Sequence, residues 1–178
     1  MNTDTAPTSA RIIAGVVDLT TAIGYVVILG MVIAIASPTL TGQASPLTAM
    51  SAVTISLLAL LLIEVPIILL WWLGESRSGT TIGKRFSGLR VVDASRGDRA
   101  TRPRCLVRTV MKVLPWAICH IALLVIIEVE APQWWAITIL VLAGAGGLGS
   151  ILAALVRTDK RAGHDLIAGT RVVTAEHR

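Results

Sequence analysis

Three titratable residues, Asp18, Glu64 and His120, lie within stretches of sequence that are otherwise strongly apolar. A carboxylate or an imidazole in such a setting can bind a proton or a hard cation in alternation. Each is costly to place against lipid, so it should face the interior of a helix bundle, a partner or water. We therefore predict that these residues bind a proton or an ion, with Arg11, about two helical turns from Asp18, as a counter-charge.

The elements that must position these residues are four apolar stretches, and crossing a bilayer takes about 20 helical residues. With 54% hydrophobic and 15% charged residues, the chain lacks the polar surface that a soluble domain needs. We predict an all-α membrane protein whose four transmembrane helices cover about residues 12–36, 51–73, 113–129 and 134–156.

The candidate residues come from three different predicted helices. At a rise of 1.5 Å per residue, Asp18 and His120 lie roughly 10 Å, and Glu64 roughly 13 Å, from the same membrane edge. The spacing therefore predicts that the three residues lie at a similar depth in the membrane, on one proton or cation pathway. The alternative is that Asp18 and Glu64 are buried packing residues that fix the helix register, and that His120 is a satisfied polar residue.

The basic residues predict the topology. All sixteen Lys and Arg side chains fall at Arg11, in residues 77–112 or in residues 157–178, and the intervening apolar regions contain none. Cytoplasmic loops carry such an excess, so we expect both termini and the loop 74–112 in the cytoplasm, with external connections in 37–50 and 128–132. These loops also explain the net charge of +5, and we expect no nucleic-acid partner.

Two short segments of the cytoplasmic part share a β pattern. Residues 88–94 and 169–175 match at five of seven positions, and each contains alternating, β-branched residues after a glycine. This pattern predicts two strands, at 89–93 and 170–174, within a small cytoplasmic cap. The sequence leaves open whether they pair with each other or with another chain.

A basic helix face is predicted just before the third span. Arg104, Arg108 and Lys112 recur at four-residue spacing after Pro103, which places three cations on one side of a helix. Such a face can bind anionic lipid headgroups, at about 1 kcal/mol per cation. The alternative is the ordinary positive bias of a cytoplasmic loop.

The sequence does not indicate catalysis. A nucleophile with an adjacent base is missing from the sequence, so we expect neither an enzyme nor a cofactor. His164 and Asp165 form one pair of potential ligands without the further ligands of a metal site, and we expect no bound metal. The glycine-rich run 144–149 lies within the fourth span rather than at a strand-to-helix turn, which argues against a dinucleotide site.

Three separated motifs cover about residues 10–173: Arg11 with Asp18, then Gly79, Gly83 and Lys84, and finally Asp165. They resemble the first Arg and Asp, the central signature and the second Asp of the RDD family of small bacterial membrane proteins. The resemblance implies one membrane domain, 11–173, with tails 1–10 and 174–178, in the bacterial cytoplasmic membrane. It also implies transport, since some members are similar to cation/proton antiporters.

The expected function is transport of a small ligand. We predict exchange of Na⁺ or K⁺ against H⁺ through the intramembrane carboxylates, within a homo-oligomer embedded in the lipid bilayer. The alternative is a non-transporting scaffold or accessory subunit that uses its basic loop and strands to dock a cytoplasmic partner.

Overall fold

The structure is a computed structural model, and it describes residues 5–41, 51–128 and 134–175. Within this part of the chain, four helices are long and apolar enough to cross a membrane. The prediction of an all-α membrane protein with four such helices is confirmed. The spans are Thr8–Ala36, Thr54–Ser78, Arg102–Ile126 and Trp134–Val156.

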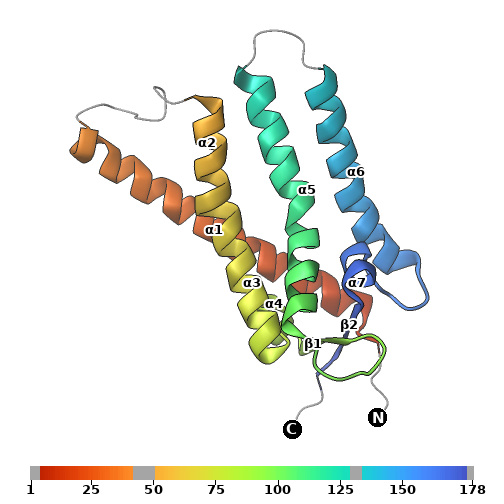
Figure 1. The fold of residues 1–178 in the computed structure, drawn as a ribbon. Coiled ribbons are helices and arrows are strands. Elements are labelled where there is room, and N and C mark those ends of the chain that lie inside the picture. Colours follow the sequence, from red (N-terminus) through yellow and green to blue (C-terminus); the bar gives the residue numbers. More distant parts are fainter. Residues whose placement is uncertain (1–4, 42–50, 129–133, 176–178) are drawn as a thin grey trace.

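The helix of the first span is inclined to the helices of the other spans. The lower part of the second span, α5 and α6 lie side by side, whereas α1 crosses behind the second span at a steep angle (Figure 1). The two chain ends lie at the same end of the molecule, as an even number of spans requires. The helical segments are α1 (Thr8–Thr41), α2 (Ala52–Ala59), α3 (Val65–Ser78), α5 (Arg102–Glu128) and α6 (Trp134–Val156).

A π-helical turn, Leu60–Glu64, joins α2 to α3, and a proline explains its position. Pro66 has no backbone N–H, so the carbonyl four residues earlier, that of Leu62, loses its helical donor. The hydroxyl of Tyr25 on α1 donates to this carbonyl at 2.5 Å. Where α1 crosses the second span, it therefore supplies a hydrogen-bond donor to a carbonyl that the proline leaves without its helical partner.

A small cap covers the end of the bundle where the chain termini lie (Figure 1). It contains two short helices, α4 (Ile82–Phe86) and α7 (Gly163–Ala168), and two strands, β1 (Leu89–Asp93) and β2 (Thr170–Thr174). The strands pair antiparallel, with Leu89 opposite Thr174 and Asp93 opposite Thr170. The two predicted strands are confirmed at the predicted residues, and within the described chain they pair with each other.

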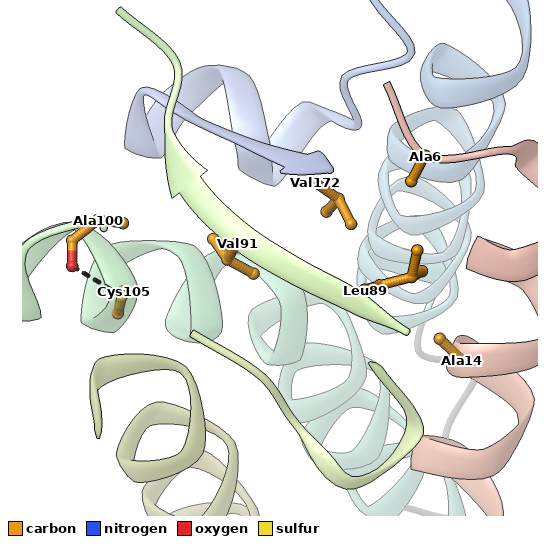
Figure 2. Packing of buried hydrophobic residues seen from close by; sticks show 7 residues of the cluster. All are labelled: Ala6, Ala14, Leu89, Val91, Ala100, Cys105 and Val172. Carbon is orange, nitrogen blue, oxygen red and sulfur yellow. Dashed lines mark hydrogen bonds between the residues drawn. The ribbon is translucent and has the colours of Figure 1, made fainter. Parts of the chain in front are cut away.

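The apolar core of the cap lies on one face of this sheet. Leu89, Val91 and Val172 of the strands form one buried cluster with Ala6, Ala14 of α1, Ala100 and Cys105 of α5. Leu89 lies on the side of Ala14, and Val91 lies on the side of Cys105 (Figure 2). The side-chain period of two puts the neighbouring positions of each strand on the opposite face. The core therefore joins the start of α1, the sheet and the start of α5 into one unit.

The start of the third span differs from its expected position. The third apolar helix begins at Arg102 rather than near residue 113, because the predicted basic helix and the span are one continuous helix, α5. The expected external connections, 37–50 and 128–132, and the outer parts of both tails lie largely outside the described residues.

Candidate functional site

Arg108 of α5 is the centre of a buried charged cluster between the bundle and the cap. Its side chain is only 3% exposed. The guanidinium Nε donates to Asp165 Oδ1 at 2.7 Å, and a terminal nitrogen donates to Glu75 Oε1. One cation thereby joins the end of α3 to α7.

Lys84 of α4 extends this cluster toward α1. Its ammonium donates to Glu75 Oε1 at 2.9 Å and lies 3.8 Å from Asp18 Oδ2. Lys112 adds a second cation beside Asp18, at 3.9 Å, and its ammonium rests 3.8 Å from the ring centre of Trp71. The family-motif residues Asp18 and Lys84 thus meet in one site.

Asp18 organises the short helix α4. One carboxylate oxygen accepts a hydrogen bond from Thr81 Oγ1 at 2.7 Å, and the other accepts from the backbone N–H of Gly83 at 2.8 Å. Thr81 is also the N-cap of α4 and accepts from the N–H of Lys84. A negative charge at the start of a helix binds the free N–H groups there, so Asp18 holds α4 against α1.

The packing of α4 on α1 requires a glycine at position 83. A Cβ atom on Gly83 would lie 2.0 Å from the carbonyl oxygen of Ala14 and 3.0 Å from the nitrogen of Asp18. Both are backbone atoms of α1 and cannot rotate away. The absence of a side chain allows the Gly83 N–H to reach the Asp18 carboxylate.

The cluster contains as many positive as negative groups. Asp18, Glu75 and Asp165 are each close to a cation of the group Lys84, Arg108 and Lys112. Breaking a buried ion pair by removing one partner costs about 3–5 kcal/mol, because the other charge remains unpaired. An added metal cation would meet a site whose carboxylates are already neutralised. The geometry therefore favours a structural connection between bundle and cap.

Asp165 and His164 fix the other side of the cap. The Asp165 carboxylate accepts hydrogen bonds from the N–H of Ala162 at 3.3 Å and from Thr170 Oγ1 at 3.2 Å. Burial alone would raise the pKa of Asp165, but the positive charge of Arg108 helps to hold it well below the ordinary value. His164 lies 3.2 Å from Ser150 Oγ of α6. Burial lowers the pKa of His164 to about 3, and the charge of Arg108 acts in the same direction.

Arg11 has a different role from the expected counter-charge. Its guanidinium donates to the backbone carbonyl of Lys160 and, at 2.8 Å, to that of Val172. The cations placed beside Asp18 are instead Lys84 and Lys112. Arg11 therefore ties the start of α1 to β2 and to the loop before α7.

Glu64 and His120 form a second polar site, within the spans. The Nδ1 atom of His120 lies 2.9 Å from Glu64 Oε1, which joins the π-helical turn to α5. Glu64 is 8% exposed, and its other oxygen is buried without a hydrogen-bond partner among the described residues. A buried oxygen of this kind has unused capacity to accept a proton or to coordinate a cation.

The expected common depth of the three candidates is wrong for Asp18. Glu75 belongs to the Asp18 cluster, and Glu64 lies eleven helical residues from it along the second span, or about 16 Å at 1.5 Å per residue. The sequence estimate placed the membrane edge near Leu73, whereas the helix continues into the cap as far as Ser78. Glu64 and His120 come together, and Asp18 lies at the level of the cap.

The three residues of the predicted headgroup face have different surroundings in the structure. The buried ion pairs of Arg108 leave it no access to lipid headgroups. Arg104 is paired with Asp93 at the end of β1, and Lys112 stacks on Trp71 while remaining 27% exposed. The four-residue spacing did place these side chains along one side of α5, but much of that side packs against the cap.

Glu75 and Thr81 are cluster residues that the sequence analysis did not single out. Glu75 follows a run of apolar residues and stands two positions before Arg77, so it looked like an ordinary interfacial charge. Its position at the end of a long apolar run was nevertheless a usable signal, because a carboxylate next to a membrane span needs a partner. Thr81 stands directly before a short helix, which is the sequence pattern of an N-cap.

The fold and its buried charges define a class of protein: a polytopic helical membrane protein whose spans are joined to a small cap through an ion-pair cluster. The family comparison agrees with this description. The model of the RDD family matches residues 5–169, and the chain belongs to that family. The comparisons with curated proteins and with solved structures found no match.

Proposed function

We propose that this RDD-family protein transports a small ligand and that protons move through the Glu64–His120 pair in exchange for Na⁺ or K⁺. The observation that carries the proposal is the 2.9 Å contact between the Glu64 carboxylate and the His120 imidazole inside the spans. Ionisable groups inside a membrane are costly and commonly mark ion or proton pathways. The pair combines an acid and a base that can share one proton.

The surroundings of the pair support this role. Glu64 closes a π-helical turn, and such turns frequently occur at functional sites. The His120 side chain is 34% exposed while Glu64 is buried, so the imidazole is the more accessible member of the pair. In this proposal Asp18 takes no direct part in proton movement, because its carboxylate already accepts hydrogen bonds from Thr81 and Gly83 of the cap.

The assay is cation-driven proton movement into proteoliposomes, with a pH-sensitive dye inside and an imposed gradient of Na⁺ or K⁺. We expect wild-type protein to move protons and both Glu64→Gln and His120→Gln to lose most of that flux. Glutamine keeps hydrogen-bonding capacity at either position while removing the titratable group. Equal insertion and an equal thermal midpoint would establish that the variants are folded.

Two results would contradict the proposal. Unchanged flux in Glu64→Gln would remove the pair from the pathway. An absence of flux from well-inserted wild-type protein under both gradients would remove cation/proton exchange itself. Asp18→Asn serves as the comparison, because we expect it to lower thermal stability by disrupting α4 rather than to block flux in the protein that remains folded.

The proposal includes a homo-oligomer in the bacterial cytoplasmic membrane, with the cap on the cytoplasmic side. The most apolar windows of the first and fourth spans bury no residues within one chain. Lipid or a second copy must cover these surfaces. The basic residues gathered at the cap end support the orientation.

A further inference from the structure

A pocket of about 390 Å³ lies on the cap, and arginine is its most frequent lining residue. Its volume is within the range of about 300–1,000 Å³ that is usual for small-molecule sites. Among the described residues of its wall, Asp98 is the acidic one. We call this hollow the arginine pocket; its arginines are Arg77, Arg90, Arg96, Arg99 and Arg171.

The sheet explains why two of these arginines face the same way. Leu89, Val91 and Val172 turn into the core, so Arg90 and Arg171 belong to the opposite face. Val92 is paired with Arg171, which makes Arg90 and Arg171 diagonal neighbours across the two strands. Both arginines line the pocket from this face of the sheet.

The remaining arginines are brought to the pocket by two turns. Gly79 ends α3 with a φ of 75°, which directs the chain away just after Arg77. Gly97, also at 75°, turns the loop after β1 so that Arg96 and Arg99 flank the hollow. A nitrogen of Arg99 donates to the carbonyl of Ser76 at 2.5 Å, which fixes that guanidinium at the rim.

The nearby carboxylate of Asp93 does not neutralise this group. It accepts hydrogen bonds from the N–H and hydroxyl of Ser95, at 2.9 and 2.6 Å, and is paired with Arg104. These contacts hold its pKa well below the ordinary value. The buried Nε of Arg90 has no hydrogen-bond partner among the described residues and so retains a free N–H donor.

We propose that the arginine pocket binds a phosphate-bearing anion. Guanidinium groups donate paired hydrogen bonds that match phosphate oxygens, and several around one hollow favour a ligand with several phosphate oxygens. A soluble polyphosphorylated molecule and an anionic phospholipid headgroup share this chemistry. The pocket shares no residue with the Glu64–His120 pair, so this inference is independent of the transport proposal.

The test uses inorganic tripolyphosphate and full-length protein in nanodiscs of phosphatidylcholine, measured by isothermal titration calorimetry. The variant is Arg77→Gln with Arg96→Gln, since both residues line the pocket and are exposed. The matched control is Arg85→Gln with Arg102→Gln, two exposed arginines that do not line it. Both double variants remove the same charge, so a difference between them reports position.

We expect the pocket variant to weaken tripolyphosphate binding by about tenfold or more, the effect of losing one hydrogen bond to a charged group. The control variant should retain an affinity within about threefold of wild type, because its effect is limited to long-range charge. Such a result would support a soluble phosphate ligand.

A second arm examines the lipid source. Protein is reconstituted in mixed phosphatidylcholine and phosphatidylglycerol, and the lipids retained on purification are quantified. Enrichment of phosphatidylglycerol by wild type and by the control, lost in the pocket variant, would support a headgroup ligand. The proposal is overturned if tripolyphosphate does not bind and phosphatidylglycerol is not enriched, or if the two double variants behave alike in both arms.

Discussion

Replacement of Gly83 by alanine tests whether the close packing of α4 on α1 holds the cap in place. The new methyl group would lie 2.0 Å from the carbonyl oxygen of Ala14, well inside van der Waals contact. The obstructing atoms belong to the backbone of a long helix, so α4 must move outward. That movement would lengthen the 2.8 Å hydrogen bond from the Gly83 N–H to Asp18.

The magnitude follows from these two effects. Overpacking costs about 1–3 kcal/mol, and loss of a hydrogen bond to a charged group costs about 1.5–3 kcal/mol. We therefore expect Gly83→Ala to lower the free energy of unfolding by about 2.5–6 kcal/mol. Repacking of the cap core around Ala14 would bring the value toward the lower end.

The assay is unfolding by dodecyl sulfate titration in mixed micelles, followed through the fluorescence of the five tryptophans. Hydrogen exchange of the segment 81–86 is the local readout, and we expect it to become faster. Gly15→Ala is the matched control, because a Cβ there meets nothing within 4 Å and alanine favours the helix by about 1 kcal/mol. A Gly83→Ala protein within about 1 kcal/mol of wild type, with unchanged exchange, would refute the packing argument.

Three further predictions concern the ties between elements. Arg108→Met should lower the free energy of unfolding by about 3–5 kcal/mol, because two buried carboxylates lose their shared cation; chemical unfolding measures this. Tyr25→Phe should cost about 1 kcal/mol, since the Leu62 carbonyl loses its hydroxyl donor, and the same titration applies. His164 is held neutral, with a pKa of about 3 against 6.5 when exposed. Its contribution is therefore complete above pH 6.5 and is lost as the pH falls, by up to about 2 kcal/mol at pH 5, as thermal unfolding across this range should show.

Each of these predictions has a contradicting outcome. An Arg108→Met protein as stable as wild type would mean that the cluster is not essential to the connection between bundle and cap. A Tyr25→Phe protein of unchanged stability would mean that water satisfies the Leu62 carbonyl equally well. A His164→Gln protein with the same loss of stability between pH 6.5 and 5 would assign that loss to another group.

The sequence by itself determined the number and kind of the elements. Four apolar stretches of this length form helices in a bilayer, because a helix hydrogen-bonds its own backbone N–H and C=O groups where no water is present. The repeated Arg-Val-Val pattern located both strands at their observed residues, since alternation with period two and a preceding glycine are local signals. Local patterns of this kind do not depend on the rest of the fold.

The tertiary structure decided which charges meet. Asp18 and Glu64 looked equivalent in the sequence, yet one is held by α4 and the other faces His120. The difference arises because the second span continues into the cap and α4 folds back on α1, which a distance counted along one helix cannot reveal. Glu75 became the shared partner of Lys84 and Arg108 for the same reason: an ion pair depends on the rotation and length of several helices at once.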